Sequence, residues 1–171
     1  MNFEAIRKRI GNTPIIEVED GIFAKLESKN PFGSVKDRVA LYMLEDAYNK
    51  GIINNDSTVI EATSGNTGIA LAAICKELEL KCIIVMPDNV GVERAEIINS
   101  FGGTVIKTPA IFGMSGAIDM ANDMALEISS MGIRVDSSTL LKQIEKSGKQ
   151  DRLKYDYHKQ ILEGKLPLSI G

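Results

Sequence analysis

The chain has little of what several classes of protein require. Its 171 residues include no tryptophan, one histidine, two cysteines and only 5% aromatic residues. A lone histidine, His158, with no second histidine or adjacent cysteine does not make a metal site, and none is expected. Two cysteines do not make a disulfide framework, and both Cys75 and Cys82 fall in apolar patterns that predict buried thiols.

Long apolar runs are also missing. The longest, such as Cys82 to Met86, fall far short of the ~20 residues that a membrane-spanning helix needs. The first seven residues, MNFEAIR, lack the apolar stretch of a signal peptide. Charged residues make up 25% of the chain and the net charge is −3, which excludes a strongly basic nucleic-acid-binding protein. We therefore expect a cytoplasmic protein with neither nucleic acid nor membrane as a partner.

Apolar strands alternate with amphipathic helices in the middle of the chain. Three apolar runs, whose starts lie 24 and 22 residues apart, are typical of buried strands: 58–62, 82–86 and 104–108. A helical pattern follows each of them: 65–78, 91–101 and 113–129. This alternation predicts right-handed βαβ crossovers. The expected fold class is α/β, with a parallel sheet covered by helices on both faces.

The two ends of the chain differ from this middle part. Residues 15–18 and 22–26 predict a β-hairpin, and residues 34–50 predict a helix. Residues 1–127 carry 12 basic and 18 acidic side chains, whereas residues 128–171 carry 8 basic and 5 acidic ones. The second region is expected to be a short, mostly helical segment. We therefore divide the chain at residue 127.

One candidate for chemistry is the loop that runs from Asn30 to Arg38. Ser34 can cap the helix that follows, and Lys36 falls in its first turn, where the helix dipole disfavours a second positive charge. Arg38 is expected to add to this effect. A lysine whose ammonium form is disfavoured is a candidate nucleophile for an aldehyde cofactor, although most single lysines are solvated surface residues.

A second candidate is the polar loop Thr63-Ser64-Gly65-Asn66-Thr67-Gly68, between a predicted strand and its helix. Ligands lie at this end of the strands in doubly wound sheets, and the free N–H groups suit a carboxylate or phosphate. A well-capped tight turn explains the same residues. The loop 86–94 follows the next strand and is expected at the same edge of the sheet.

Several motifs, in one order, resemble cysteine synthase (O-acetylserine sulfhydrylase), a pyridoxal-phosphate enzyme of fold type II. The resemblance covers residues ~8–127 and rests on GNTP (11–14), KLE (25–27), NP (30–31), SVKDR (34–38), EATSGNTGIA (61–70), MP (86–87), ER (93–94) and GMSGA (113–117). It implies that Lys36 forms a Schiff base with pyridoxal phosphate and that Asn66 bonds the cofactor. It also implies that Thr63, Ser64, Gly65, Asn66 and Thr67 bind the substrate carboxylate.

The function implied by this resemblance is β-substitution, which forms L-cysteine from O-acetylserine and sulfide. The expected partner is a small amino-acid substrate. The sequence leaves open whether the chain forms a homo-oligomer. In the family, the loop for the cofactor phosphate lies beyond the matched part, and residues 128–171 contain no equivalent. A non-catalytic α/β fragment or chimera that binds a small carboxylate is therefore the alternative.

The tail, residues ~127–171, resembles a late part of ammonia-dependent asparagine synthetase. The resemblance rests on EISSMGIRVD (127–136), YHK (157–159) and LPLSIG (166–171). It implies that Glu127 and Ser130 are remnants of an ATP and magnesium site. A third function, ATP-dependent ligation of ammonia to aspartate, would follow from it. Most of that enzyme, including its aspartate site, has no counterpart here.

Overall fold

The computed structural model describes residues 1–130. A sheet of three parallel strands lies at its centre, in the order β3 (Thr58–Ala62), β4 (Lys81–Pro87) and β5 (Thr104–Thr108). Ala62 lies opposite Val85, and Pro87 lies opposite Thr108, so the three strands end at one edge. The short, mostly helical segment expected at the C-terminal end lies outside the described residues.

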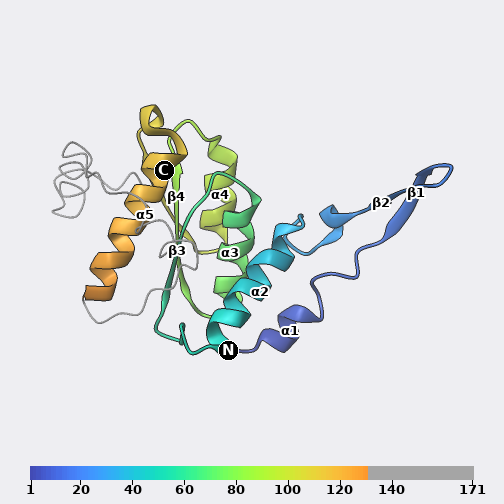
Figure 1. The fold of residues 1–171 in the computed structure, drawn as a ribbon, viewed down its shortest axis with the longest axis horizontal. Helices are drawn as coiled ribbons and strands as arrows, with labels where there is room; N and C mark the ends of the chain where they lie inside the picture. Colours follow the sequence, from blue (N-terminus) through green and yellow to red (C-terminus); the bar gives the residue numbers. More distant parts are fainter. Residues whose placement is uncertain (131–171) are drawn as a thin grey trace.

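Helices cover both faces of this sheet, which confirms the predicted α/β fold. Helices α3 (Asn66–Glu77) and α4 (Val92–Ser100) lie on one face, and α5 (Gly113–Ser130) lies on the other (Figure 1). On the outer side of α3 lies α2 (Lys36–Asn49), and α1 (Phe3–Arg7) packs against α2. Within residues 1–130, no helix is both long and apolar enough to cross a membrane.

The core has two apolar clusters, one on each face of the sheet. The larger lies among α1, α2, α3 and α4 and includes the fully buried Ile74, Ile84 and Ile98. The smaller lies beneath α5 and joins Ile60, Val85 and Ile106 to the alanines and methionine of that helix. Successive residues of a strand point to opposite faces, so Ile84 and Val85 enter different clusters. Both cysteines are buried thiols, as expected.

A two-stranded hairpin stands apart from this core. Strands β1 (Ile15–Glu19) and β2 (Ile22–Lys25) pair antiparallel, at the positions that the sequence predicts. The hairpin projects away from the sheet and helices (Figure 1), and its side chains are largely exposed. A short 3₁₀ helix, Glu27–Lys29, joins it to the loop before α2.

Some details differ from the expectations. The apolar pattern over 91–101 predicts that Ala95, Ile97 and Ile98 all point inward, but Ile97 is 42% exposed, whereas Ala95 and Ile98 are buried. The helix has only nine residues, and a buried pair three positions apart already fills the side that faces the sheet. The sequence also gave no indication of α1 or of the 3₁₀ helix Ala110–Phe112.

Candidate active site

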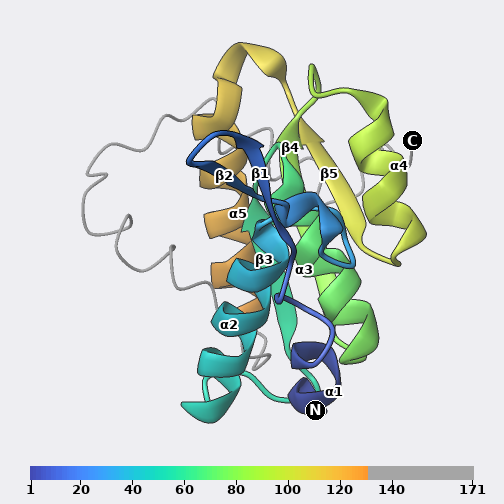
Figure 2. The same cartoon turned by 90° about the vertical axis from the view of Figure 1, so that its right-hand side faces the viewer.

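The loops predicted to carry chemistry leave the sheet at the same edge, as expected. Beyond β3, the N–H of Thr63 donates to the carbonyl of Val85 at 3.0 Å. Beyond β4, the N–H of Asp88 donates to the carbonyl of Thr108 at 2.8 Å. Each bond extends the strand pairing by one step and fixes where its loop begins. Figure 2 shows the three strands with helices α3 and α4 beside them.

The polar loop continues directly into α3. The N–H of Gly65 donates to the Thr63 hydroxyl at 3.3 Å, and the helix begins at Asn66 without a side-chain cap. Asn66 is exposed, while Thr63, Ser64, Gly65 and Thr67 are half-buried. The N–H groups of an uncapped first turn favour an anionic partner. These five residues therefore form one continuous polar surface at the start of the helix.

Gly68 fixes the distance between this loop and the sheet. A Cβ atom built on Gly68 would lie 2.9 Å from Cγ2 of Thr63 and 3.1 Å from Cγ2 of Ile84. Both distances are shorter than ordinary carbon contacts, so only glycine lets the helix approach the strands this closely. A Cβ built on Gly65, in contrast, would meet nothing within 4 Å. The side of the loop at Gly65 is therefore open.

Arg94, in the first turn of α4, joins two of the loops. Its guanidinium donates to the backbone carbonyl of Ser64 at 2.9 Å, across 30 positions of sequence. The sequence indicated that the two loops share an edge of the sheet, but it did not indicate this bond. Arg94 thus restrains the polar loop from outside its own segment.

Lys36 is the first residue of α2 and so lies in the first turn of the helix, as predicted, although the helix begins two residues later than expected. Its backbone N–H donates to the Ser34 hydroxyl at 3.1 Å, but Ser34 lies one residue before the cap position, which Val35 occupies. The side chain of Lys36 is half-buried. Helix α2 packs against α3, and both run in the same direction (Figures 1 and 2). Lys36 and Asn66 therefore each begin one of two neighbouring helices.

The expectation for Arg38 was wrong. We expected its charge to act together with the helix dipole on Lys36, but the guanidinium is paired with Glu27 through two bonds, of 2.9 and 3.0 Å. Thr13 and Asn30 also donate to the Glu27 carboxylate, at 2.9 and 2.8 Å. Hydrogen bonding from Arg38 is the largest cause that lowers the pKa of Glu27, to about 2. This cluster could not be predicted from the sequence, because its members come from three separate segments of the chain.

Asp37 is buried directly after Lys36. Its exposed fraction is 0%, and one carboxylate oxygen accepts the N–H of Phe32 at 2.7 Å. The other oxygen has no hydrogen-bond partner. Burial raises the pKa of Asp37 above its ordinary value, against the effect of neighbouring backbone N–H groups. The carboxylate closes the loop from Phe32 to Asp37 and so fixes the backbone that carries Lys36.

Glu127 and Ser130 do not join these residues. Both lie in the last turn of α5, whereas α5 begins at Gly113 after β5 reaches the edge that carries the loops. A rise of about 1.5 Å per residue puts Glu127 roughly 20 Å along the helix from that edge. Among residues 1–130, no group of three or more His, Cys, Asp and Glu side chains could hold a metal ion.

The geometry described above agrees with a match to a known family. Residues 6–145 match the family model described as "Pyridoxal-phosphate dependent enzyme". The chain belongs to the family of pyridoxal-phosphate dependent enzymes. This match covers most of the chain, including Lys36, the loop Thr63–Gly68 and Arg94. It also passes residue 127, where we expected a second region to begin, and α5 continues through that position.

Curated relatives within the family are cysteine synthases. The chain is 46% identical over 133 residues to cysteine synthase of a Flavobacterium strain, which covers 74% of this chain and 43% of that protein. It is 49% identical over 126 residues to cysteine synthase B of Campylobacter jejuni, which covers 72% and 42% of the two chains. The chain therefore spans less than half the length of the relatives it matches.

Solved structures of the family share the fold. Cysteine synthase of Entamoeba histolytica matches with a TM-score of 0.70 and 35% identity, over 77% of this chain and 41% of that one. An O-acetylserine dependent cystathionine beta-synthase from Helicobacter pylori matches with a TM-score of 0.67 and 39% identity, over 72% and 43%. The resemblance of the tail to asparagine synthetase finds no support in these comparisons.

Proposed function

We propose that this chain supplies the lysine-bearing part of an active site for β-substitution, which converts O-acetylserine and sulfide into L-cysteine and acetate. One observation carries the proposal: Lys36 and Asn66 each begin one of two packed helices, within a chain 46–49% identical to two cysteine synthases. The amino acid would be bound at the loop Thr63–Thr67. Lys36 would bind pyridoxal phosphate.

The residues present fit one end of pyridoxal phosphate. The cofactor's aldehyde needs an amine, and the half-buried Lys36 offers one at a helix start held by Ser34 and Asp37. The uncapped first turn of α3 offers N–H groups to an anion, and the exposed Asn66 offers an amide. The open side of Gly65 leaves room for a planar ring. The described residues identify no equivalent of the family's phosphate loop.

The chain's own residues would divide the work as follows. When bound, pyridoxal phosphate supplies an electron sink that stabilises negative charge on the substrate's α-carbon. The loop Thr63–Thr67 holds the substrate carboxylate and so turns the α-hydrogen toward the amine of Lys36. The Nζ of Lys36 would take this proton, and acetate would leave with the electron pair of its C–O bond. Sulfide would then form the new bond to the β-carbon, and Lys36 would return the proton to the α-carbon.

Named relatives narrow the substrate to serine carrying a leaving group on its hydroxyl. One matched structure is described as O-acetylserine dependent, and another as an O-acetyl serine sulfhydrylase. Both names contain O-acetylserine, a serine whose oxygen is part of a better leaving group than hydroxide. We propose O-acetylserine as the donor and sulfide as the nucleophile. We also propose a cytoplasmic location, where buried thiols such as Cys75 and Cys82 stay reduced.

Reduction with borohydride tests the cofactor part of this proposal. Pyridoxal phosphate is added to the 171-residue chain, the adduct is reduced, and peptide mass mapping locates the modified lysine. We expect modification at Lys36 in preference to other lysines and its loss in Lys36→Ala. Lys50→Ala is the matched control, because Lys50 is an exposed lysine at the other end of the same helix. Modification spread evenly over the exposed lysines would contradict the proposal.

Turnover is measured separately on the same samples. Formation of cysteine from O-acetylserine and sulfide, abolished in Lys36→Ala, would support the full reaction. Specific labelling of Lys36 without turnover would support the alternative, a binding module that lacks the rest of the active site. The chain spans less than half the length of its relatives, and this alternative is therefore tested directly. The division of the chain at residue 127 stays a proposal, supported by the change in charge between its two parts.

A further inference from the structure

The loop that carries Lys36 is held at both of its ends by the carboxylate of Glu27. At the start of the loop, the side-chain amide of Asn30 donates to Oε2 of Glu27 at 2.8 Å. Two residues after Lys36, the guanidinium of Arg38 donates to Oε2 from Nε at 2.9 Å and to Oε1 from Nη2 at 3.0 Å. Both ends of the loop are therefore bonded to a single side chain.

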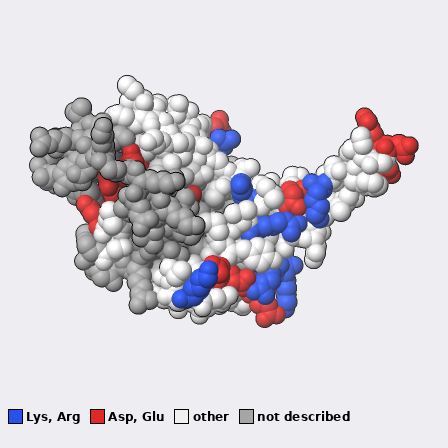
Figure 3. All heavy atoms as spheres, viewed as in Figure 1, with Lys and Arg blue, Asp and Glu red and all other residues white. Residues whose placement is uncertain are grey.

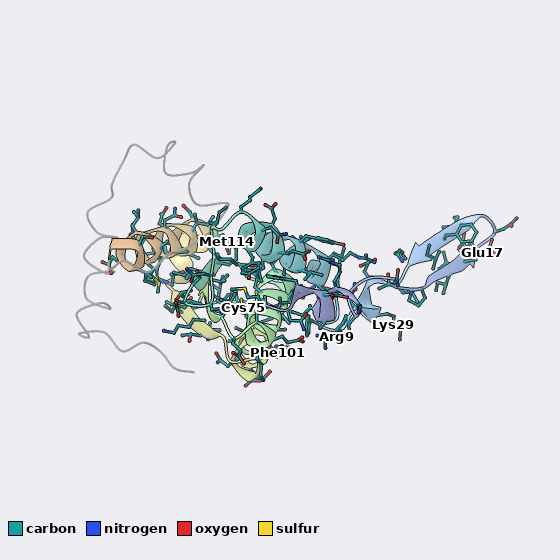
Figure 4. All side chains as sticks on the ribbon, turned by 90° about the horizontal axis from the view of Figure 1, so that it is seen from below. Arg9, Glu17, Lys29, Cys75, Phe101 and Met114 are labelled. Carbon is teal, nitrogen blue, oxygen red and sulfur yellow. The ribbon has the colours of Figure 1, made fainter. Side chains whose placement is uncertain are left out.

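Glu27 belongs neither to this loop nor to α2. It is the first residue of the short 3₁₀ helix that joins the hairpin to the body. Figure 4 labels Lys29, the last residue of that helix, at the base of the hairpin. Figure 3 shows acidic and basic side chains next to one another where the hairpin meets the body. Glu27 can therefore restrain the loop from a separate segment of the chain.

The Glu27 carboxylate is itself held in one orientation. The hydroxyl of the buried Thr13 donates to Oε1 of Glu27 at 2.9 Å. The buried Asn30 also accepts the N–H of Gly11 at 2.9 Å. A Cβ atom built on Gly11 would lie 2.8 Å from Nη1 of Arg38, so the backbone of Gly11 lies directly against the guanidinium. A polar network whose members are all paired makes the structure around it rigid.

The other ion pairs of α2 make fewer contacts. Glu45 accepts from Arg7, and Asp46 accepts from Lys50, each through one bond between two side chains. Glu27, in contrast, accepts four side-chain hydrogen bonds from three residues. A simple surface ion pair contributes little to stability and does not need such a set of partners. The additional bonds all fix the place of the loop relative to its surroundings.

We propose that Glu27 is a positioning residue for Lys36. By bonding Asn30 and Arg38 together, it keeps the loop between them in one conformation and so presents the amine of Lys36 to the cofactor from a fixed helix start. This inference rests on the proposed binding of pyridoxal phosphate at Lys36. A displacement of about 1 Å, caused by a change outside the site, can cost a reaction about a hundredfold in rate.

Borohydride trapping on the full 171-residue chain tests this role. Glu27→Ala removes all four bonds, and we expect labelling of Lys36, relative to that of Lys50, to fall about tenfold or more. Glu27→Gln keeps the length of the side chain and one acceptor oxygen, so it should recover part of the labelling. The matched control is Glu45→Gln, which breaks an ion pair of the same helix away from the loop and should label as the unmodified chain does. Thermal unfolding shows that each variant is folded when it is labelled.

The pH profile of labelling separates position from charge. A positioning role predicts that Glu27→Ala lowers the maximum of the profile and leaves its midpoint in place. A role through charge alone predicts the reverse, because the positive charge of Arg38 would no longer be balanced: the midpoint would move to lower pH and the maximum would stay. That second result would overturn the proposal, as would an equal loss of labelling in Glu45→Gln.

Hydrogen exchange tests the restraint without the cofactor. The N–H of Phe32 donates to Asp37 and that of Lys36 donates to Ser34, so both amides report on the loop. Glu27→Ala should speed their exchange and leave that of α3 unchanged, and unchanged exchange in the loop would overturn the proposal whatever the labelling shows. An unmodified chain that does not prefer Lys36 would contradict the proposed function instead. Preferential labelling of Lys36 that survives in Glu27→Ala would contradict this inference alone.

Discussion

The guanidinium of Arg94 and the carbonyl oxygen of Ser64 lie 2.9 Å apart and link the first turn of α4 to the loop before α3. Arg94→Ala removes this restraint while leaving the core intact. We expect weaker binding of a carboxylate ligand at the loop and a loss of about 1 kcal/mol or less in stability. Ligand titration and thermal unfolding measure the two effects. Arg94→Lys should recover part of the binding, and equal loss in both variants would indicate that the specific bond is unimportant.

Gly68→Ala is expected to move the polar loop. The added methyl group would lie 2.9 Å from Thr63, so Thr63 or the helix must shift. Overpacking costs about 1–3 kcal/mol, and alanine returns up to about 1 kcal/mol of helix propensity. We expect a net loss of about 1–2 kcal/mol by denaturant unfolding. The control Gly65→Ala adds a methyl group in open space and should change stability by less than about 0.5 kcal/mol.

Glu27 should make the protein sensitive to acid. Its pKa falls from 4.5 to about 2 in the folded chain, chiefly because Arg38 donates to it. The stability it contributes is fully present above pH 4.5 and is lost as the pH falls toward 2. Glu27→Gln should therefore be less stable than the unmodified chain at neutral pH, with the difference shrinking below pH 4.5. A difference that stays constant down to pH 2 would contradict this assignment.

The ionised carboxylate of Asp37 should lower the stability of the protein, whereas that of Glu27 raises it. Burial raises its pKa above the ordinary 3.8, so the ionised carboxylate costs stability at neutral pH. This loss of stability disappears below pH 3.8. It reaches its full size once the pH is above the raised pKa of Asp37 in the folded chain. Asp37→Asn keeps an oxygen that can accept the Phe32 N–H. Relative to this variant, the unmodified chain should gain stability as the pH is lowered from neutral toward 3.8, measured by denaturant unfolding at each pH.

The βαβ part of the fold was predictable because its pattern is local. Strands β3 and β5 have the predicted bounds, and α3 and α4 each lie within one residue of theirs. Short apolar runs and amphipathic stretches fix these elements without distant partners. Parallel strands end at the same edge of a sheet, so the edge that carries the polar loop could be predicted from the strand pattern alone. The sequence pattern alone therefore predicts that Lys36 and Asn66 lie near the starts of helices.

Features that depend on distant partners were missed. Helix α1 has five residues and is held by burial of Phe3 and Ile6 and by contact between the rings of Phe3 and Tyr48. No local pattern indicates such packing, since short helices owe their stability to tertiary contacts. The pairing of Arg38 with Glu27 was missed for the same reason. That pairing offsets the positive charge of Arg38 that was expected to act on Lys36.

The two buried thiols offer a chemical measure of opening. Cys75 in α3 lies against Cys82 in β4, and this contact, together with burial, raises the pKa of Cys75 well above its ordinary range. Thiolates, rather than thiols, react with alkylating reagents, so the folded protein should resist them. Modification then requires α3 to separate from the sheet. The alkylation rate of the unmodified protein thus measures how often its larger core cluster opens, and no cysteine has to be introduced.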